Sequence, residues 1–329
     1  MRTVATTPGL YPLPDDAKER LSDLKGHQKH DLVSGDEGEE VRAVYRDARE
    51  RVVETQREAG LDRVVEGQLR WDDMLAHPLC VHDGVRTEGI VRYYDNNNFY
   101  REPVVEGELT YDGDVAAELE AASEATDDLQ AVLPGPHSLA DLATDEHYGD
   151  EAEFLAAVGE FLAREVEAFP EVETLFLLDP SLVTNPPAED RYEAVVEAVD
   201  GVVGAADCEV VLHTYWGAFD EKTHAHVLDS DVDALGYDLV SAPEESVELI
   251  AEYGSADDVA LGLVDGQNTL VESPSTIRER VEWFEDRLPS AVDFDTAYLT
   301  SNTELFYLPV NRFKEKLRAL GAATTEVEA

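Results

Sequence analysis

The sequence predicts an α/β fold of the (β/α)8 class, a single TIM barrel over residues 1–320, on three observations. Short apolar runs alternate with acidic helical stretches over most of the chain. The runs are continuously apolar, which is typical of parallel strands covered on both faces. Eight such runs indicate a closed barrel. An open, doubly wound sheet is the alternative, but no Gly-x-Gly-x-x-Gly motif opens a helix, which disfavours its dinucleotide-binding form.

Each expected strand is short and adjoins an acidic helical stretch or a polar loop. The first strand precedes a Pro- and Gly-rich loop that runs to Pro14. The second begins after Gly60, which ends a long amphipathic helix in the manner of a C′ glycine. The expected strands are residues 3–7, 61–71, 130–134, 174–179, 209–214, 234–240, 259–264 and 296–300. The expected helices are residues 17–24, 39–59, 152–168, 191–203, 246–253 and 275–288.

Residues 88–112 depart from this alternation. Two segments, residues 90–94 and 106–111, flank an Asn-rich stretch within the sequence YYDNNNFYREPVV. This pattern indicates a β-hairpin or an ordered loop, so we expect an excursion between the second and third strands of the barrel. At the end of the chain, residues 321–329 are expected to form a disordered tail.

Acidic residues far outnumber basic ones. The 329 residues include 73 Asp and Glu against 25 Lys and Arg, a formal net charge of −48, while 43% of the residues are hydrophobic. The hydrophobic fraction is enough for a core, so the charge does not imply disorder. Scarce lysine with abundant acid indicates a high-salt cytoplasm, where a Debye length of about 3 Å at molar salt screens self-repulsion. A merely acidic protein is the alternative. We expect no nucleic-acid binding through a basic face.

The cysteines and histidines give little support for a metal site. Cys80 and Cys208 lie far apart without CxxC spacing, so no disulfide framework is expected. His224 and His226 are two residues apart and do not share a helix face. No apolar run approaches the roughly 18 residues that a membrane-spanning helix needs, and no signal peptide is recognisable. We expect a soluble cytoplasmic protein with no metal bound to this chain.

Polar and aromatic side chains follow most of the expected strands. In a barrel, the residues at the carboxyl ends of the strands meet on one rim and form the active site. Structural explanations exist for single residues: Asp179 precedes a proline and can simply end its strand, and His213 can lie behind the site. The rim residues expected to bind a planar, polar substrate are Trp71, His137, Asp179, His213, Tyr215, Trp216, Asp265, Asn268 and Asn302.

One segment of the excursion resembles a known family. The sequence YDNNNFY at residues 94–100, followed by Pro103, resembles the Asp-x-Asn-x-x-Tyr segment in the N-terminal half of cobalamin-independent methionine synthases. Through this resemblance, Asp95, Asn97 and Tyr100 join the residues expected to bind substrate.

Three strand exits resemble motifs of the same family, in the family's order. The sequence LPGPHSL at residues 133–139 is similar to its Gly-Pro-aromatic-Ser/Thr exit motif. HTYWG at residues 213–217 is similar to the Thr-Thr-Tyr-aromatic segment of the N-terminal half, and VDGQN at residues 264–268 to its Asp-Gly-Arg-Asn turn. Together the motifs extend the resemblance over residues 1–320.

The resemblance implies one barrel of a two-barrel enzyme that transfers a methyl group from methyl-folate to homocysteine. In the family's C-terminal barrel, zinc is held by a His-x-Cys pair, a Glu and a late Cys. The positions matching the His-x-Cys pair and the late Cys are Tyr215, Gly217 and residues 302–303, and the Asp-Glu-Pro motif is reduced to Asp179-Pro180. A thiol needs a metal to become a thiolate at neutral pH. The resemblance therefore points to the zinc-free N-terminal half, with a separate zinc-bearing barrel as partner and methyl-folate as co-substrate.

Two other functions stay open. One is a self-sufficient methyltransferase that takes its methyl group from another carrier, such as a corrinoid protein. The other is an enzyme similar to the related uroporphyrinogen decarboxylases. There, Asp95 or Asp265 would hold pyrrole nitrogens, and Arg70, Arg92 and Arg101 would bind the substrate's carboxylates.

Overall fold

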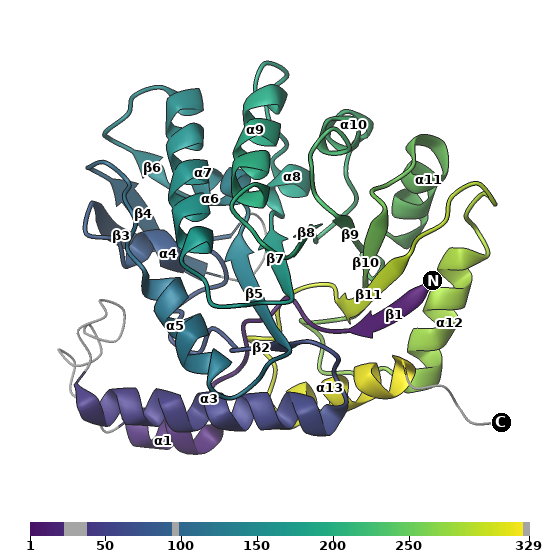
Figure 1. The fold of residues 1–329 in the computed structure, drawn as a ribbon, viewed down its shortest axis with the longest axis horizontal. Helices are drawn as coiled ribbons and strands as arrows, with labels where there is room; N and C mark the ends of the chain where they lie inside the picture. Colours follow the sequence, from purple (N-terminus) through teal and green to yellow (C-terminus); the bar gives the residue numbers. More distant parts are fainter. Residues whose placement is uncertain (23–37, 94–98, 325–329) are drawn as a thin grey trace.

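Eight parallel strands form one curled sheet in the computed structural model, which describes residues 1–22, 38–93 and 99–324 (Figure 1). Neighbouring strands follow the order β1-β11-β10-β9-β8-β7-β5-β2. The prediction of eight parallel strands separated by helices is confirmed. The strands are β1 (Arg2–Ala5), β2 (Val64–Val65), β5 (Leu129–Pro134), β7 (Thr174–Leu178), β8 (Glu209–His213), β9 (Ala234–Asp238), β10 (Asp258–Val264) and β11 (Thr296–Ser301).

The two ends of this sheet meet without a strand ladder between them. β1 and β2 are the edge strands, and no pairing of β1 with β2 occurs among the described strand pairs. Just before β2, the N–H groups of Asp62 and Arg63 donate to the carbonyl of Ala5 at 2.9 and 3.3 Å. The sheet is therefore a curled half-barrel. The described strand pairs do not close it into the barrel that the sequence predicts.

β2 is much shorter than the predicted strand over residues 61–71. Gly67 and Gln68 have positive φ angles of 100° and 46°, which break an extended chain. The side chain of Glu66 accepts the N–H of Gln68 at 2.7 Å and stabilises this turn. The apolar pattern continues past the strand because the following residues, including Leu69 and Trp71, are buried in the loop.

Helices surround the outer face of the sheet, and their apolar sides supply the rest of the core (Figure 1). The longest, α3, ends at Gly60, whose φ of 80° is the predicted left-handed cap. The long helices are α1 (Asp15–Ser22), α3 (Glu39–Ala59), α5 (Asp114–Ser123), α7 (Glu151–Glu167), α9 (Tyr192–Val203), α10 (Glu221–Val227), α11 (Pro243–Tyr253), α12 (Pro274–Glu285) and α13 (Val310–Thr324). The short ones are α4 (His77–Cys80), α6 (Pro136–Asp141) and α8 (Ser181–Thr184).

The predicted excursion between the second and third barrel strands is a hairpin. Strands β3 (Val85–Arg92) and β4 (Phe99–Val105) pair antiparallel, and β6 (Thr144–Asp145) adds to β4 in parallel. This small sheet lies beside α4 at one side of the molecule (Figure 1).

Part of the expected tail is helical. Residues 321–324 belong to α13, and residues 325–329 lie outside the described residues. A Cβ on Gly321 would come within 2.0 Å of the carbonyl oxygen of Ala59, so α13 and the end of α3 are in backbone contact there. This close packing keeps the last turn of the helix in the fold.

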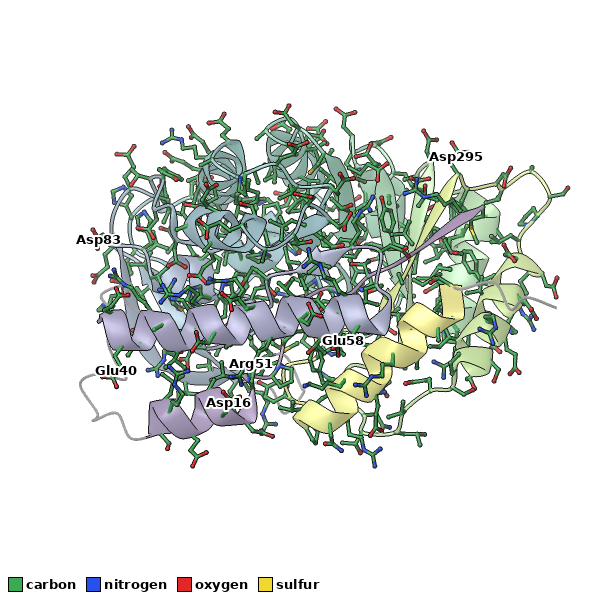
Figure 2. All side chains as sticks on the ribbon, turned by 60° about the horizontal axis from the view of Figure 1, so that its bottom comes forward. Asp16, Glu40, Arg51, Glu58, Asp83 and Asp295 are labelled. Atoms are coloured by element: carbon green, nitrogen blue, oxygen red, sulfur yellow. The ribbon has the colours of Figure 1, made fainter. Side chains whose placement is uncertain are left out.

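Acidic side chains cover the outside of the molecule. Glu40, Glu58, Asp83 and Asp295 are exposed and lie on different elements around it (Figure 2). Few of the acids on the outside have a basic partner; Asp16 of α1 forms an ion pair with Arg51 of α3. Among the described helices, none combines the length and hydrophobicity needed to cross a bilayer.

Candidate functional site

Asn302 joins the carboxyl ends of four neighbouring strands, β8 to β11. Its Nδ2 donates to both oxygens of Asp238, which ends β9, at 3.1 and 3.2 Å. Its Oδ1 accepts from the N–H of Gly266 after β10 at 3.0 Å, and its carbonyl accepts from Nε2 of His213 on β8 at 2.8 Å. Asp238 also accepts the N–H of Trp216 at 2.9 Å. This set, the Asn302 network, fixes one half of the rim.

His213 is held in a neutral form by this environment. Its side chain is fully buried, and burial lowers its pKa below the usual value. Because a carbonyl can only accept, Nε2 must carry the proton. Nδ1 is then an acceptor that has no hydrogen-bond partner within the described part of the chain. A Cβ on Gly236 would lie 2.2 Å from Nδ1, so the neighbouring strand needs glycine at this point.

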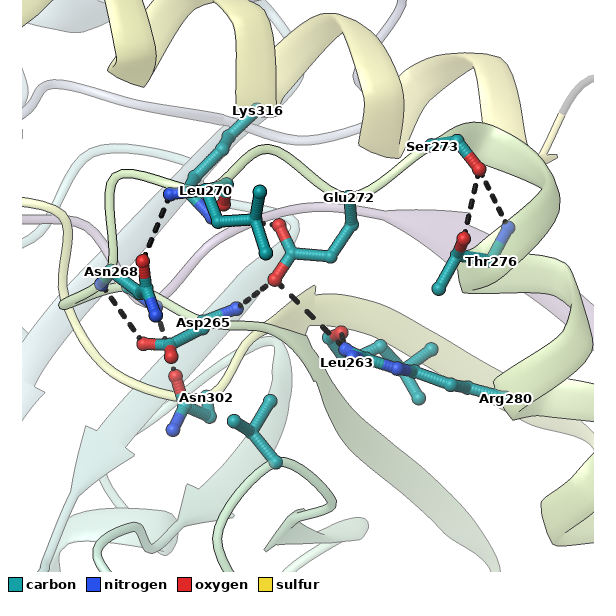
Figure 3. A network of polar contacts seen from close by, with 12 residues as sticks. Leu263, Asp265, Asn268, Leu270, Glu272, Ser273, Thr276, Arg280, Asn302 and Lys316 are labelled. Carbon is teal, nitrogen blue, oxygen red and sulfur yellow. Dashed lines mark hydrogen bonds and ion pairs between the residues drawn. The ribbon is translucent and has the colours of Figure 1, made fainter.

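The loop after β10 is anchored to the Asn302 network and to α13 (Figure 3). Oδ1 of Asp265 accepts the N–H groups of Gln267 and Asn268 at 2.9 and 3.1 Å, which makes a tight turn. Oε1 of Glu272 accepts the N–H of Asp265 at 2.9 Å, and its Oε2 is 2.7 Å from Nζ of Lys316. The loop that carries Asp265 and Asn268 therefore has a defined shape.

A second group of expected residues lies at the exits of β5 and β7. The buried Asp179 accepts from the N–H and the Oγ of Ser138 at 2.8 and 2.6 Å, and from the N–H of His137 at 3.2 Å. A Cβ on Gly135 would lie 2.2 Å from Oδ2 of Asp179, so the Gly-Pro motif leaves room for this carboxylate. Burial raises the pKa of Asp179. Its two oxygens are used to hold the first turn of α6.

A cavity of about 500 Å³ opens beside His137, between α6, α7 and α9. Its floor is apolar and includes Phe154 and Leu155, and its rim carries Arg191 and Asp141. Nε2 of His137 is 3.0 Å from the carbonyl of Asn185 at this rim. The cavity lies outside the sheet, so His137 faces a different space from the Asn302 network.

The hairpin is tied to the loop after β2 through Tyr93, which has no exposed surface. Its hydroxyl donates to Oδ1 of Asp73 at 2.6 Å and accepts the N–H of Leu75 at 3.1 Å. Its ring centroid is 4.5 Å from that of Tyr100. Burial raises the pKa of Tyr93 well above its usual value, and the charge of Asp73 raises it further. The hairpin and the loop after β2 are therefore joined through Tyr93 and Asp73.

Tyr215 contacts a buried acid that the sequence does not single out. Its hydroxyl donates to Oε1 of Glu304 at 2.5 Å, while Oε2 has no hydrogen-bond partner among the described residues. Burial, with a smaller contribution from the charge of Asp73, raises the pKa of Glu304 to about 8. Glu304 therefore carries a proton at neutral pH and offers no carboxylate to a cation there.

Two glutamines, Gln130 near the start of β5 and Gln68 after β2, lie beside the exit of β1. Gln130 accepts from Oγ1 of Thr6 at 2.6 Å and donates to the carbonyl of Thr7 at 2.8 Å. Oε1 of Gln68 accepts the N–H of Leu10 at 2.7 Å. On this side too, the polar groups of the rim are bonded to one another.

The expected residues fall into three adjoining groups. His213, Tyr215, Trp216, Asp265, Asn268 and Asn302 lie in or beside the Asn302 network, where the ring centroids of Tyr215 and Trp216 are 4.7 Å apart. His137 and Asp179 lie at the exits of β5 and β7, and Trp71 and Tyr100 lie near the hairpin. Trp71 is buried and stacks on His77, with ring centroids 5.2 Å apart. Asp95 and Asn97 lie outside the described residues. Their roles in substrate binding stay predictions.

Sequence reasoning missed several residues that organise the rim. The sequence predicts a strand over residues 234–240 with Asp238 inside it. An acid that follows an apolar run can also mark the end of a strand, as Asp179 does. The sequence around Asp73 and Glu304 gives no sign that either acid is buried. Lys316 looks like one of the exposed bases of an amphipathic helix, and only the packing shows that it is 1% exposed.

The residues present do not fit a zinc site. At the positions where the resemblance puts zinc ligands, Tyr215 is bonded to Glu304, Gly217 has no side chain, and Oγ1 of Thr303 donates to a carbonyl. Cys208 precedes β8, at the opposite end of the strand from His213, and burial raises its pKa to about 12. No group of three or more His, Cys, Asp or Glu residues within ranges 1–22, 38–93 and 99–324 is arranged to hold a metal ion.

Comparisons of the sequence and of the fold with known proteins point to the same family. Residues 4–295 match the family model described as the catalytic domain of the cobalamin-independent synthases. A methionine synthase of Saccharolobus solfataricus is 24% identical over 296 residues, 85% of this chain and 83% of that protein. One of Sulfolobus acidocaldarius is 22% identical over 279 residues, 83% and 78% respectively. The solved structure of a B12-independent methionine synthase from Shewanella has a similar fold, with a TM-score of 0.78, 18% identity and coverage of 98% and 96%.

Proposed function

Because the chain belongs to the cobalamin-independent methionine synthase family, we propose that it acts in methionine biosynthesis as a barrel that does not itself hold zinc. It works with a separate zinc-bearing barrel, which activates homocysteine for methyl transfer from methyl-folate. The observation that carries this proposal is the identity of the residues at the positions matched to the family's zinc ligands. Tyr215, Gly217 and Thr303 stand there and cannot supply thiolate or imidazole donors.

The internal bonding of the rim supports a role in docking rather than in chemistry. The Asn302 network uses most of its polar groups internally, and Tyr93 joins the hairpin to the loop after β2. A catalytic centre needs donors and acceptors aimed at a reacting group, whereas here most of them are aimed at one another. We infer that substrate and partner meet the outer edge of the rim, where Asn268 and Tyr100 are accessible.

The proposal has two further parts, closure of the barrel and a high-salt cytoplasm. We infer that the eight strands act as a closed barrel, since Asp62 and Arg63 already bridge β2 to β1. We place the protein in a high-salt cytoplasm because its net charge of −48 would otherwise strain the fold.

A self-sufficient methyltransferase is the second candidate, favoured by one observation. The matched family model is that of the catalytic domain, and the relative from Saccharolobus is covered over 83% of its length, so that relative is also close to one barrel in size. A decarboxylase has less support, because Arg70 is paired with Asp114 and Glu118, and Arg101 with Asp72.

Reconstitution tests the proposal. The chain is purified in molar salt, and methionine formation from homocysteine and methyl-folate is measured for this chain, for a zinc-bearing barrel from the same cell, and for both together. We expect turnover only when the zinc-bearing barrel is present, with a higher rate in the mixture. Turnover by this chain alone supports the second candidate, and an unchanged rate in the mixture contradicts the partnership.

A further inference from the structure

Lys316 is a buried cation that the proposed function does not use. It lies on α13, outside the sheet, yet its side chain is 1% exposed. Its Nζ donates to Oε2 of Glu272 at 2.7 Å and to the carbonyl of Leu270 at 2.5 Å (Figure 3). Taking an ammonium group out of water is unfavourable even when it is paired, so a buried lysine does not by itself indicate stability. A role in holding a specific geometry accounts for it better.

One carboxylate connects this lysine to the rim. Glu272 is 8% exposed and divides its two oxygens, with Oε2 toward Lys316 and Oε1 accepting the N–H of Asp265 at 2.9 Å. The next N–H, that of Gly266, donates to Oδ1 of Asn302. Figure 3 shows the contacts that lead from Glu272 through Asp265 toward Asn302, with Lys316 on the neighbouring helix α13. A displacement of Lys316 would therefore reach the Asn302 network through two hydrogen bonds of the backbone.

The same lysine also fixes the tip of the loop. The N–H of Leu270 donates to Oδ1 of Asn268 at 2.9 Å, and its carbonyl accepts from Lys316. Both polar backbone groups of Leu270 are thus held, although its side chain is 74% exposed. Loops on a surface usually leave such groups to water, so this exposed residue is unusually constrained.

We propose that Lys316 is a positioning residue for the loop over residues 265–272, the β10-exit loop. Through Glu272 and the carbonyl of Leu270, it holds Asp265, Asn268 and Leu270 in one arrangement at the rim. The purpose of that arrangement is to bind the partner barrel, and this purpose rests on the proposed function. A preformed loop binds a partner without losing conformational entropy. The positioning itself is a property of this chain alone.

The alternative is an ion pair that merely stabilises the packing of α13. The two differ in what happens when both charges are removed together. Lys316→Met alone would leave Glu272 buried without its cation and would disturb the whole region. The double variant Lys316→Met, Glu272→Gln removes both charges and keeps an amide oxygen for the N–H of Asp265. It leaves the carbonyl of Leu270 without its donor and removes the charge that lies 4.0 Å from the guanidinium of Arg280, which keeps its hydrogen bond to the carbonyl of Leu263.

Hydrogen–deuterium exchange on the full chain measures the difference. In the double variant we expect the amides of residues 266–272 to exchange at least tenfold faster, with those of β10 and of α13 unchanged. Lys314→Met, on the same helix, is the matched control and should leave the β10-exit loop protected. Unchanged exchange in this loop, acceleration spread over the whole chain, or failure of the double variant to fold would each overturn the positioning role.

A binding measurement then tests the purpose of the loop. The dissociation constant for the zinc-bearing barrel should rise about tenfold in the double variant and stay unchanged in Lys314→Met. If the unsubstituted chain does not bind that barrel, the proposed function fails, while the exchange result still decides the positioning role. If the double variant has a mobile loop but binds the barrel as tightly as the unsubstituted chain, the loop positions nothing for the partner.

Discussion

The residues that decide the chemistry of this rim are bonded to one another rather than presented to a ligand. Asn302 uses its Nδ2, Oδ1 and carbonyl on Asp238, Gly266 and His213. Glu304 and Asp73 are buried with one oxygen each left without a hydrogen-bond partner among the described residues. Each such oxygen carries a desolvation cost, and both acids respond by a raised pKa.

Glu304 should make the stability of the fold fall as the pH rises. Its pKa is about 8 in the fold against 4.5 for the ordinary group, so between these values the folded chain binds more protons than the unfolded one. The free energy of unfolding then falls by at most about 1.4 kcal/mol per pH unit. In Glu304→Gln this fall between pH 5 and 8 should be smaller, as measured by urea denaturation at constant salt. Glu58→Gln, an exposed acid, serves as control, and identical pH profiles for all three proteins would contradict a buried Glu304.

Gly236 should not tolerate a methyl group. In Gly236→Ala the new Cβ would lie 2.2 Å from Nδ1 of His213, so we expect a loss of about 1–3 kcal/mol in the free energy of unfolding. Gly201→Ala in α9, where nothing lies within 4 Å of the new Cβ, should be neutral or stabilising by up to about 1 kcal/mol. Equal effects in chemical denaturation would mean that His213 is not packed against β9.

At the scale of elements, the hairpin β3–β4 forms one side of the rim. It is attached to the loop after β2 by Tyr93, whose hydroxyl contacts Asp73 and Leu75. The same hairpin packs Tyr100 against Tyr93. The hairpin is thus a part of the rim rather than an independent insertion.

Removing one hydroxyl should loosen this attachment. Tyr93→Phe leaves the buried Asp73 with one donor fewer, and the N–H of Leu75 keeps only Oδ1 of Asp73, at 2.8 Å, as its acceptor. We expect this loss to cost about 1–3 kcal/mol. Amides of β3 and β4 should exchange faster than those of β7 or β8. Tyr111→Phe provides a comparison at an exposed tyrosine, and exchange that rises equally in the hairpin and in the central strands would argue against a local anchor.

The sequence predicted the elements better than the contacts between them. Continuous apolar runs such as residues 174–178 and 209–213 are recognisable because both faces of a parallel strand are buried. β2 was predicted too long, since the residues after Gly67 are buried in a loop. The partners of Asn302 come from three other strands, β8, β9 and β10, and no local pattern shows which side chain an acid such as Asp238 will contact.

At the scale of the whole molecule, the main feature is the excess of acidic over basic residues. With a formal net charge of −48 on 329 residues, acidic side chains such as Glu40 and Asp295 project from the outside of the molecule (Figure 2). Repulsion among exposed charges is long-ranged in dilute buffer and is screened at molar salt. The fold therefore depends on its ionic surroundings more than a neutral protein of this size does.

Salt should stabilise the chain strongly. We expect the midpoint of thermal unfolding to rise steadily between 0.1 and 3 M KCl, because screening lowers the repulsion that unfolding relieves. Differential scanning calorimetry measures the midpoint, and a neutral osmolyte raised to the same osmotic strength separates screening from exclusion. A midpoint independent of KCl would contradict the high-salt adaptation.

Zinc content tests the central claim most directly. The chain purified alone in molar salt and the complex isolated with its zinc-bearing barrel are compared by elemental analysis. A barrel without zinc ligands predicts far less than one zinc per chain in the first sample and about one per complex in the second. Near-stoichiometric zinc in the chain alone would contradict the account, since Tyr215, Gly217 and Thr303 could not then mark a lost metal site.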